Sequence, residues 1–457
     1  MTKPTSSPVA SPKGTRDLYP DQYLRQNYIT RLWRDTALRH GFEEINGPTF
    51  EMLELYTRKS GEGIVGELFR FRREGGEDDY ALRPEFTPTL ARMYAAKAAS
   101  LPSPTKWFSI GPYFRAEKPQ RGRLREFLQW NVDVLGGDEE IGDSDVLSCM
   151  TAFLLDTGLH EGEVTNRVSD RRRMTRSLVE AGVSESNQEQ ALALLDRKDK
   201  VDPDSFRSQA VALGMSESAA SSLLQGTTEL AFEDLTLIER MVNAGFESGW
   251  FAYDPSIVRG LAYYTGTVFE VIAEGERAIA GGGRYDNLIE LFGGPPTPAV
   301  GFGMGDVVLG LLLDDKGLMP QGAELMDALS RPGASLRPEA FVVAGSEDED
   351  PLVEPLLANL RRGVEREGFD GKPWAADRYA VRPMHARRTY KTTRNLKKLL
   401  NDAEKQHARF AIVLHGADKV QVKDLDKREE LVHDRGDFSV EPASDAYVGK
   451  AIAQRLT

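Results

Sequence analysis

The feature that most constrains the fold is a basic loop within residues 113–133, which lies between two segments with the composition of β-strands. The stretch reads YFRAEKPQRGRLREFLQWNVD, and after the loop apolar residues recur at every second position: Leu128, Trp130, Val132 and Val134. Successive side chains of a strand point to opposite faces of a sheet. The pattern therefore predicts a strand with one face in the core and the other face polar.

The polar face of this strand carries Gln129, Asn131 and Asp133. An amide and a carboxylate that point the same way offer hydrogen-bond acceptors to a small cationic ligand. Arg115 follows the preceding strand-like segment, and its planar guanidinium suits a carboxylate or phosphate oxygen. The residues alone leave one alternative, a solvated β-hairpin with a charged tip, because runs of charge usually lie on the surface.

A second candidate region is residues 81–94, ALRPEFTPTLARMY, in which an extended segment leads into a helix that Pro88 can start at its first turn. Glu85 and Thr87 lie at this junction. A carboxylate and a hydroxyl at such a turn can bind an α-ammonium group. The alternative is that Thr87 caps the helix.

A third candidate region is residues 257–270, IVRGLAYYTGTVFE. Its β-branched and aromatic residues predict a strand, which places Arg259 and the pair Tyr263–Tyr264 where that strand begins. Paired tyrosines more often pack in a core or an interface. The run Gly281–Gly283 that follows permits close approach of the backbone to a ligand, although glycine runs also form bulges and turns.

Together, residues 81–94, 113–133 and 257–270 resemble, in chain order, the histidine–tRNA ligase family of class II aminoacyl-tRNA synthetases. FRAEKPQRGRLREFLQ is similar to motif 2, LRPEFT to the LRPE-x-T element, and RGLAYYTG to the RGLDYYTG signature, with Ala262 where the family usually has aspartate. The segment FEEINGPTFEMLELYTRKSGE resembles motif 1 with its proline, Pro48, an element through which class II synthetases build a dimer interface.

The largest departure from the family pattern stands in the place of motif 3, where the chain reads GFGMGDVVLGLLL. The usual form ends in Gly-x-Glu-Arg, and its arginine holds ATP. Here Asp306, Val307 and Val308 follow Gly305, so the acid–arginine pair is absent. The way in which the base and outer phosphate of ATP are held therefore stays open.

The resemblance also implies a role for each site residue. The implied histidine-binding residues are Glu85, Thr87 and Gln129 for the ammonium group, Asp133 and Tyr264 for the two imidazole nitrogens, and Tyr263 and Tyr285 nearby. The implied ATP-binding residues are Arg115, Glu117, Arg123 and Arg259. The resemblance implies that Arg115 and Arg259 are the catalytic pair and flank the α-phosphate. Two fixed cations there would offset its repulsion of an attacking carboxylate. Mg²⁺ is expected with the nucleotide, and no protein metal site is expected.

At 457 residues the chain is too long for one compact core. We expect an α+β fold: the antiparallel sheet of class II synthetases flanked by helices, with a helical insertion and a C-terminal α/β anticodon-binding domain. The expected divisions are a flexible tail (1–12), a catalytic core (13–170 and 246–317), the insertion (171–245), a linker (318–337) and the C-terminal domain (338–457). Within the last, residues 352–367 are expected to form a helix.

Charge is unevenly distributed along the chain. Residues 331–457 hold 23 Lys+Arg and 21 Asp+Glu, a net charge of +2, against −15 for residues 1–330. Seven cations follow one another without an intervening acid: Arg382, Arg387, Arg388, Lys391, Arg394, Lys397 and Lys398. We expect this basic run to bind tRNA phosphates, with a solvated helix face as the alternative.

The remaining features concern location. The single Cys149 excludes a disulfide framework and fits a reducing cytosol. Without a run of about 18 apolar residues, a membrane span is not expected. The first dozen residues lack an apolar signal core, so a cytoplasmic protein is expected.

The function that the resemblance implies is ATP-dependent attachment of L-histidine to tRNA(His) through a histidyl-adenylate, by a homodimeric enzyme. One alternative is a non-catalytic paralogue such as the regulatory subunit of ATP phosphoribosyltransferase, which usually lacks the C-terminal domain and the RGLxYYTG signature. Another is an RNA-binding protein whose catalytic site has decayed.

Overall fold

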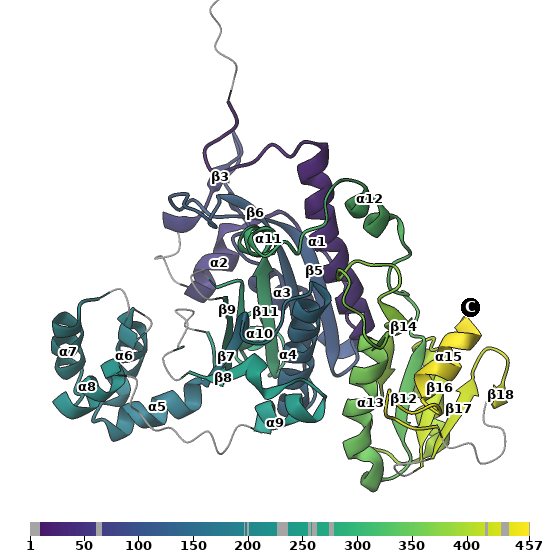
Figure 1. The fold of residues 1–457 in the computed structure, drawn as a ribbon. Helices are drawn as coiled ribbons and strands as arrows, with labels where there is room; N and C mark the ends of the chain where they lie inside the picture. Colours follow the sequence, from purple (N-terminus) through teal and green to yellow (C-terminus); the bar gives the residue numbers. More distant parts are fainter. Residues whose placement is uncertain are drawn as a thin grey trace, which may run out of the picture.

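The computed structural model describes residues 10–60, 66–195, 197–198, 201–225, 236–254, 257, 263–273, 278–415, 419–430 and 438–456. Two sheets organise these residues: a large one in the first two thirds of the chain and a smaller one near the C-terminus (Figure 1). None of the helices in the described ranges combines the length and the apolar composition that crossing a bilayer requires.

The large sheet has eight strands in the order β1-β5-β6-β11-β10-β9-β7-β8. Their bounds are β1 (Glu43–Glu44), β5 (Thr105–Phe114), β6 (Glu126–Leu135), β11 (Ala299–Gly305), β10 (Ala280–Arg284), β9 (Thr267–Ala273), β7 (Val164–Asp170) and β8 (Phe251–Tyr253). In this order, every pair of neighbouring strands from β5 to β7 is antiparallel, which confirms the expected antiparallel sheet. Only the outer pairs β1–β5 and β7–β8 are parallel.

One face of this sheet is covered by three helices: α1 (Pro20–Arg39), α4 (Glu139–Asp156) and α11 (Asp306–Asp315). The period-two pattern of β6 is confirmed, since Trp130, Val132 and Val134 are buried in the core beneath these helices. Trp33 of α1 stacks on Trp130, with ring centroids 6.0 Å apart. The polar positions of β6 therefore face the opposite side of the sheet.

That opposite side is bordered by smaller elements. Helix α3 (Thr87–Ala95) packs on α10 (Leu288–Leu291) in a second core cluster. Beside α3 lies α2 (Leu53–Ser60), which packs on a three-stranded sheet. The strands of that sheet, in spatial order, are β2 (Phe50–Met52), β4 (Asp79–Leu82) and β3 (Arg70–Arg72).

A helical lobe projects to one side of the large sheet (Figure 1). It consists of α5 (Arg171–Glu180), α6 (Gln188–Leu195), α7 (Pro203–Ala212) and α8 (Glu217–Gln225), which share a core of their own. The next helix, α9 (Thr236–Asn243), packs instead on α4, and its Met241 is buried in the main core.

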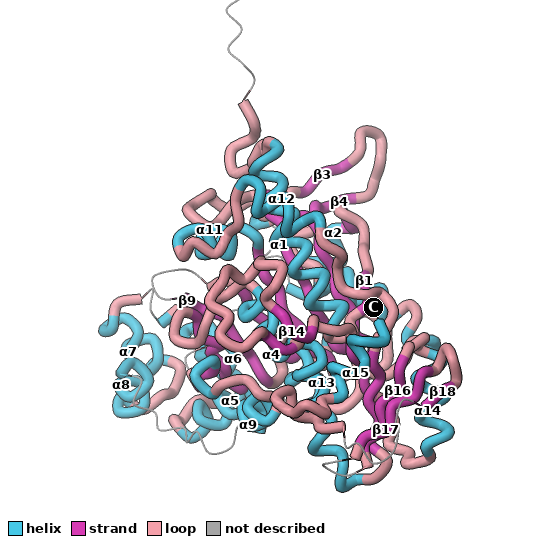
Figure 2. The backbone as a smooth tube through the Cα atoms, turned by 45° about the vertical axis from the view of Figure 1, so that its right-hand side comes forward, coloured by secondary structure: helices cyan, strands magenta, loops and turns pink. Residues whose placement is uncertain are grey.

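The C-terminal sheet has the order β15-β12-β16-β17-β18, and it lies at the opposite end of the molecule from the all-helical lobe (Figure 2). Its strands are β12 (Ala340–Ala344), β15 (Ala386–Arg388), β16 (Phe410–Leu414), β17 (Val420–Asp424) and β18 (Glu429–Glu430). The accompanying elements are α13 (Asp350–Arg362), α14 (Leu396–Lys405), α15 (Val448–Leu456) and the pair β13 (Val364–Glu365) and β14 (Tyr379–Val381). The alternation of strands and helices confirms an α/β arrangement.

Two local expectations were wrong. The helix expected over residues 352–367 ends at Arg362, because Gly363 adopts φ +75° and the chain turns into a short strand. The expected linker over 318–337 contains a helix, α12 (Gly322–Ser330). Its Leu325 is buried in the main core, and α12 packs on α1, so this segment is part of the packed structure.

Candidate active site

A cavity of about 950 Å³ lies against the polar face of the large sheet. Nine of the predicted site residues line it: Glu85, Thr87, Arg115, Arg123, Gln129, Asp133, Tyr263, Tyr264 and Tyr285. They come from the β5–β6 loop, from β6, from the start of α3 and from the segments that flank β9 and β10. The fold thus brings together parts of the chain that are up to 200 residues apart. Glu117 is not among the lining residues, and Arg259 lies outside the described residues.

Asp133 is the most deeply buried acid of the cavity, with 4% of its surface exposed. The hydroxyl of Tyr285 donates a hydrogen bond of 2.5 Å to its Oδ1. Burial raises the pKa of Asp133 to about 7, although the bond from Tyr285 acts in the opposite direction. The carboxylate is thus poorly compensated, and a further hydrogen-bond donor from a ligand would stabilise its charged form.

The floor of the cavity is glycine backbone. Gly301 and Gly303 of β11 pair with Asp133 and Asn131 of β6. A Cβ atom on Gly301 would lie 2.0 Å from Oδ1 of Asp133, and one on Gly303 would lie 2.0 Å from Nε2 of Gln129. Any side chain at these positions would therefore displace the polar groups of β6. This role was not predicted from the sequence, although the glycines at every second position of GFGMG carry a signal for it.

Glu85 and Thr87 lie at the rim where α3 begins. The residue before the helix is Phe86, and no side chain caps the helix, so the alternative interpretation of Thr87 as the cap is wrong. The hydroxyl of Tyr263 donates to Oε2 of Glu85 across 3.3 Å. Both Glu85 and Thr87 reach the cavity, which leaves a carboxylate and a hydroxyl available to an ammonium group.

Three tyrosines form one wall. The ring centroids of Tyr263 and Tyr264 are 4.9 Å apart, and those of Tyr263 and Tyr285 are 6.1 Å apart. The ring of Tyr264 lies against the bare backbone of Gly283, where a Cβ atom would approach it to 2.9 Å. Burial raises the pKa of Tyr263 and of Tyr285 well above the usual value, so both hydroxyls stay protonated and can donate.

The basic loop supplies the charged side of the cavity. Arg115 donates through Nε to the backbone oxygen of Pro84 across 3.3 Å, and its guanidinium lies 5.3 Å from the ring centroid of Phe127. Arg123 reaches the cavity and pairs with Glu117, with Nε 2.7 Å from Oε2. Arg115 is therefore held by a carbonyl and an aromatic ring, whereas Glu117 positions Arg123.

Asp306 stands where the family has the acid–arginine pair of motif 3, but its contacts are with other parts of the protein. Its buried carboxylate accepts the backbone N–H of Leu128 at 2.9 Å, Nη2 of Arg16 at 2.7 Å and Nε2 of Gln26 at 3.0 Å. It thereby fastens α11 to β6, to α1 and to the N-terminal segment. Val307 and Val308 line the cavity and present apolar groups where the family places charge.

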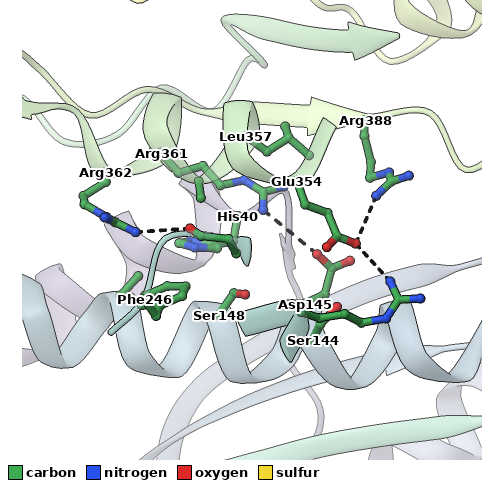
Figure 3. A pocket seen from close by; sticks show the side chains of 14 residues that line it. His40, Ser144, Asp145, Ser148, Phe246, Glu354, Leu357, Arg361, Arg362 and Arg388 are labelled. Carbon is green, nitrogen blue, oxygen red and sulfur yellow. Dashed lines mark hydrogen bonds and ion pairs between the residues drawn. The ribbon is translucent and has the colours of Figure 1, made fainter. Parts of the chain in front are cut away.

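A second set of buried charges lies where α4 meets the C-terminal domain (Figure 3). Nζ of Lys106 donates to Asp145 at 3.0 Å and to the backbone oxygen of His40 at 2.9 Å. The hydroxyl of Tyr390 donates to Asp145 at 2.6 Å, and Arg361 lies 4.0 Å away. We call these residues (Lys106, Asp145, Arg361 and Tyr390) the interdomain cluster. A void of about 30 Å³ adjoins Asp145 and Arg361, which is room for water only. A larger cavity of about 400 Å³ is lined by Lys106, Arg361 and Tyr390, and Asp145 does not reach it.

The predicted basic run is mostly neutralised by acids from other segments. Five of its members have acidic partners: Arg382 with Glu339, Arg387 with Glu43, Arg388 with Glu354, Lys391 with Asp402 and Arg394 with Asp350. Lys397 and Lys398 are exposed on α14, and within the described ranges their ammonium groups have no ion pair. The run is therefore far less electropositive than its sequence implies.

Comparison with known proteins gives a consistent picture. A family model described as histidyl-tRNA synthetase matches residues 14–305. The histidine–tRNA ligase of Opitutus terrae is 40% identical over 74% of this chain and 84% of its own length. The chloroplastic/mitochondrial histidine–tRNA ligase of Arabidopsis thaliana is 36% identical over 76% of this chain and 75% of its own.

Solved structures show the same fold. A histidine–tRNA ligase subunit of Alicyclobacillus acidocaldarius matches with a TM-score of 0.53 and 26% identity, over 68% of this chain and 99% of that one. The histidyl-tRNA synthetase of a Nostoc species matches with a TM-score of 0.57 over 98% of this chain and all of that one. At 20% identity, the second match supports the fold alone.

Proposed function

This chain belongs to the histidyl-tRNA synthetase family, and from that premise we propose that the cavity on β6 and β11 is where it activates histidine. The enzyme attaches histidine to tRNA in an ATP-dependent reaction. A histidine carboxylate attacks the α-phosphate of ATP, and pyrophosphate leaves. The terminal ribose 3′-hydroxyl of the tRNA(His) then attacks the carbonyl carbon of the histidyl-adenylate, and AMP leaves. Relatives 36–40% identical are ligases, which favours this function over a regulatory paralogue.

The observation that carries the proposal is the state of Asp133. It is buried, it receives one side-chain donor from the described residues, Tyr285, and its pKa is raised by burial to about 7. An imidazole N–H that enters beside it supplies the missing donor. The hydroxyl of Tyr264 is proposed to meet the other ring nitrogen, so the pair selects a ring with two polar nitrogens.

The ammonium and carboxylate of the substrate are proposed to lie nearer the rim. Glu85, Thr87 and Gln129 offer oxygen acceptors to the ammonium group. Arg115 is proposed to flank the α-phosphate with Arg259, since two fixed cations stabilise the charge that develops there. Because no side chain acts as nucleophile, the residues contribute mainly by orienting the two substrates.

The nucleotide is proposed to bring Mg²⁺ with it. An Mg²⁺ ion that accompanies a nucleotide is bound chiefly by its phosphates. When bound, Mg²⁺ neutralises phosphate charge. Arg123, fixed by Glu117, is proposed to contact the same nucleotide from the basic loop.

Histidine-dependent exchange of pyrophosphate into ATP tests the proposal. We expect exchange with histidine and none with other amino acids, whereas a regulatory paralogue or a decayed enzyme shows none at all. Arg259→Ala should reduce the exchange rate about a hundredfold or more while tRNA binding and circular dichroism stay unchanged. An Arg259→Ala rate within about threefold of wild type would reject its role.

We propose that the enzyme is a homodimer and that the sheet β2-β4-β3 contributes to the interface with a second copy. Phe50, Phe71 and Tyr80 form an aromatic cluster on this sheet with ring centroids 5.6–5.8 Å apart. Phe50 is 50% exposed and Phe71 is 43% exposed, and apolar patches of this kind commonly mark interfaces. Phe71→Glu should yield a monomer by light scattering, while Leu336→Glu, a control at another exposed position, should not.

We further propose the domain division given by the sequence: a catalytic core (13–170 and 246–317), an inserted helical domain (171–245) and an anticodon-binding domain (338–457). The separate core of α5–α8 and the separate C-terminal sheet support the inserted and C-terminal domains, whereas α9 (Thr236–Asn243), within the proposed insertion, packs on α4 of the catalytic core. A cytoplasmic location is proposed on the same basis as the function, since the substrates tRNA and ATP are found there.

A further inference from the structure

Arg284 is a buried arginine that directly precedes Tyr285 of the cavity. It ends β10, and 1% of its surface is exposed. Its Nη2 donates to Oδ1 of Asp143 at 2.6 Å and to the backbone oxygen of Glu139 at 2.7 Å. Its Nη1 donates to Oδ1 of Asp286 at 3.0 Å. Since Asp143 and Glu139 belong to α4, the guanidinium lies on the face of the sheet opposite the cavity.

The two aspartates extend this network to two more segments, the start of β9 and the start of β11. Asp143 accepts the hydroxyl of Thr267 at 2.7 Å. Asp286 accepts the hydroxyl of Thr265 at 2.9 Å and the backbone N–H of Ala299 at 2.9 Å. One guanidinium therefore ties the first turn of α4 to the start of β9, the end of β10 and the start of β11.

Each tied segment carries a cavity group next to the tie. Tyr264 precedes Thr265, Tyr285 follows Arg284, and Gly301 lies two residues after Ala299. Because these groups share a backbone with the tied residues, a shift of the network moves the tyrosine rings relative to Asp133. An apolar side chain in place of Arg284 would fill the same space between β10 and α4, but it would not hold the three segments by hydrogen bonds of fixed direction.

We propose that Arg284 is a positioning residue for the reaction: with Asp143 and Asp286 it holds the rings of Tyr264 and Tyr285 where they and Asp133 recognise the imidazole of histidine. The proposal rests on the assignment of the cavity as the histidine site. A displacement of about 1 Å in such a site is enough to cost up to a hundredfold in rate.

The first test is Arg284→Lys, which keeps the charge but replaces the planar fork, whose two terminal nitrogens serve Asp143 and Asp286 separately, by one ammonium group. We expect the histidine KM to rise about tenfold in the pyrophosphate exchange assay, with the ATP KM within about twofold of wild type. Arg361→Lys is the matched control, because Arg361 is also a buried arginine near a carboxylate but belongs to the interdomain cluster. It should lower Tm without raising the histidine KM.

A second variant covers the case in which Arg284→Lys does not fold. Thr267→Val removes the bond to Asp143 at nearly constant volume and should raise the histidine KM about threefold in the same selective way. Equal increases in both KM values, or a lower Tm with both KM values unchanged, would overturn the proposal. If instead wild-type enzyme exchanges with histidine but Asp133→Asn leaves its KM unchanged, the site assignment fails and not the network alone.

Discussion

Asp133 and Asp145 are both buried carboxylates, 4% and 8% exposed, but their surroundings differ. Asp133 receives one hydroxyl and faces a cavity of about 950 Å³. Asp145 receives Lys106 and Tyr390, has Arg361 nearby, and adjoins a void of about 30 Å³. Burial raises the pKa of Asp133 to about 7. Burial also opposes ionisation of Asp145, but its cationic neighbours outweigh that effect and lower its pKa.

This difference distinguishes a ligand-binding site, at Asp133, from a structural contact between domains, the interdomain cluster at Asp145, which we call the joint. The folded protein completes the charge balance of Asp145 with its own groups, and in doing so it fixes the C-terminal domain against α4. The folded protein does not fully neutralise the charge of Asp133, which lowers its stability, and the substrate supplies the missing hydrogen-bond donor. The degree of compensation is therefore more informative about function than burial, and the following substitutions test that distinction.

The largest effect is expected at the joint. Asp145→Asn leaves Lys106 and Arg361 buried without their carboxylate, and the unfolding free energy should fall by about 3–5 kcal/mol in a denaturant titration. Glu43→Gln is the control, since it removes an exposed partner of Arg387 at 3.3 Å and should cost about 0.5 kcal/mol or less. A decrease below about 1 kcal/mol for Asp145→Asn would show that the cluster is not a strong joint.

In the cavity, removal of the buried carboxylate is expected to raise the unfolding free energy. At pH 8, Asp133→Asn should stabilise the substrate-free protein by about 2 kcal/mol, because an amide avoids burial of a poorly compensated charge. The same substitution should raise the histidine KM about thirtyfold, because an uncharged oxygen accepts the ring N–H more weakly. The ATP KM should stay within about twofold of wild type. If Asp133→Asn destabilises the protein as Asp145→Asn does, the distinction between site and joint is wrong.

The pH dependence of stability should separate the two acids as well. The folded-state pKa of Asp133, about 7, exceeds the usual aspartate value of 3.8, so the folded protein keeps a proton that the unfolded chain releases. The stability advantage of Asp133→Asn should thus vanish near pH 4, grow as the pH rises and level off above pH 7. Asp145 has a lowered pKa, so its contribution should be present above the unfolded pKa and decrease as the pH falls below it. Melting curves of wild type and both variants from about pH 2 to about pH 8 cover both windows and measure this.

Much of the cavity could be predicted because its pattern is local. The alternation over residues 128–134 determines which side chains of β6 share a face, and that periodicity placed Gln129 and Asp133 on the polar side. What periodicity cannot specify is the strand that lies opposite. The pairing of Gly301 with Asp133, the bonds from Arg284 to Asp143 and the fastening of Arg16 to Asp306 all join residues more than 130 positions apart.

The ion pairs of the basic run could not be predicted from the sequence for the same reason. Its sequence shows no acid between Arg382 and Lys398, but Glu43, Glu339, Asp350, Glu354 and Asp402 come from other segments and neutralise it. A count of charges along the chain cannot reveal partners that the fold supplies. The cations of the basic run thus differ in whether the fold gives them a partner of opposite charge, just as Asp145 differs from Asp133.

The smallest predicted effect follows from that distinction. Lys397 and Lys398 are exposed and lack an acidic partner within the described ranges, so they remain free to bind phosphate. Replacing both by alanine should weaken tRNA binding a few-fold and reduce the slope of log K against log salt by roughly one for each phosphate that is no longer neutralised. The control replaces Arg382 and Arg394, whose charges Glu339 and Asp350 already neutralise, and it should change the slope little. If the control variant lowers the slope as much as the lysine variant does, the ion pairs of Arg382 and Arg394 open when tRNA binds. An acidic partner in the free protein would then not decide which cations bind RNA.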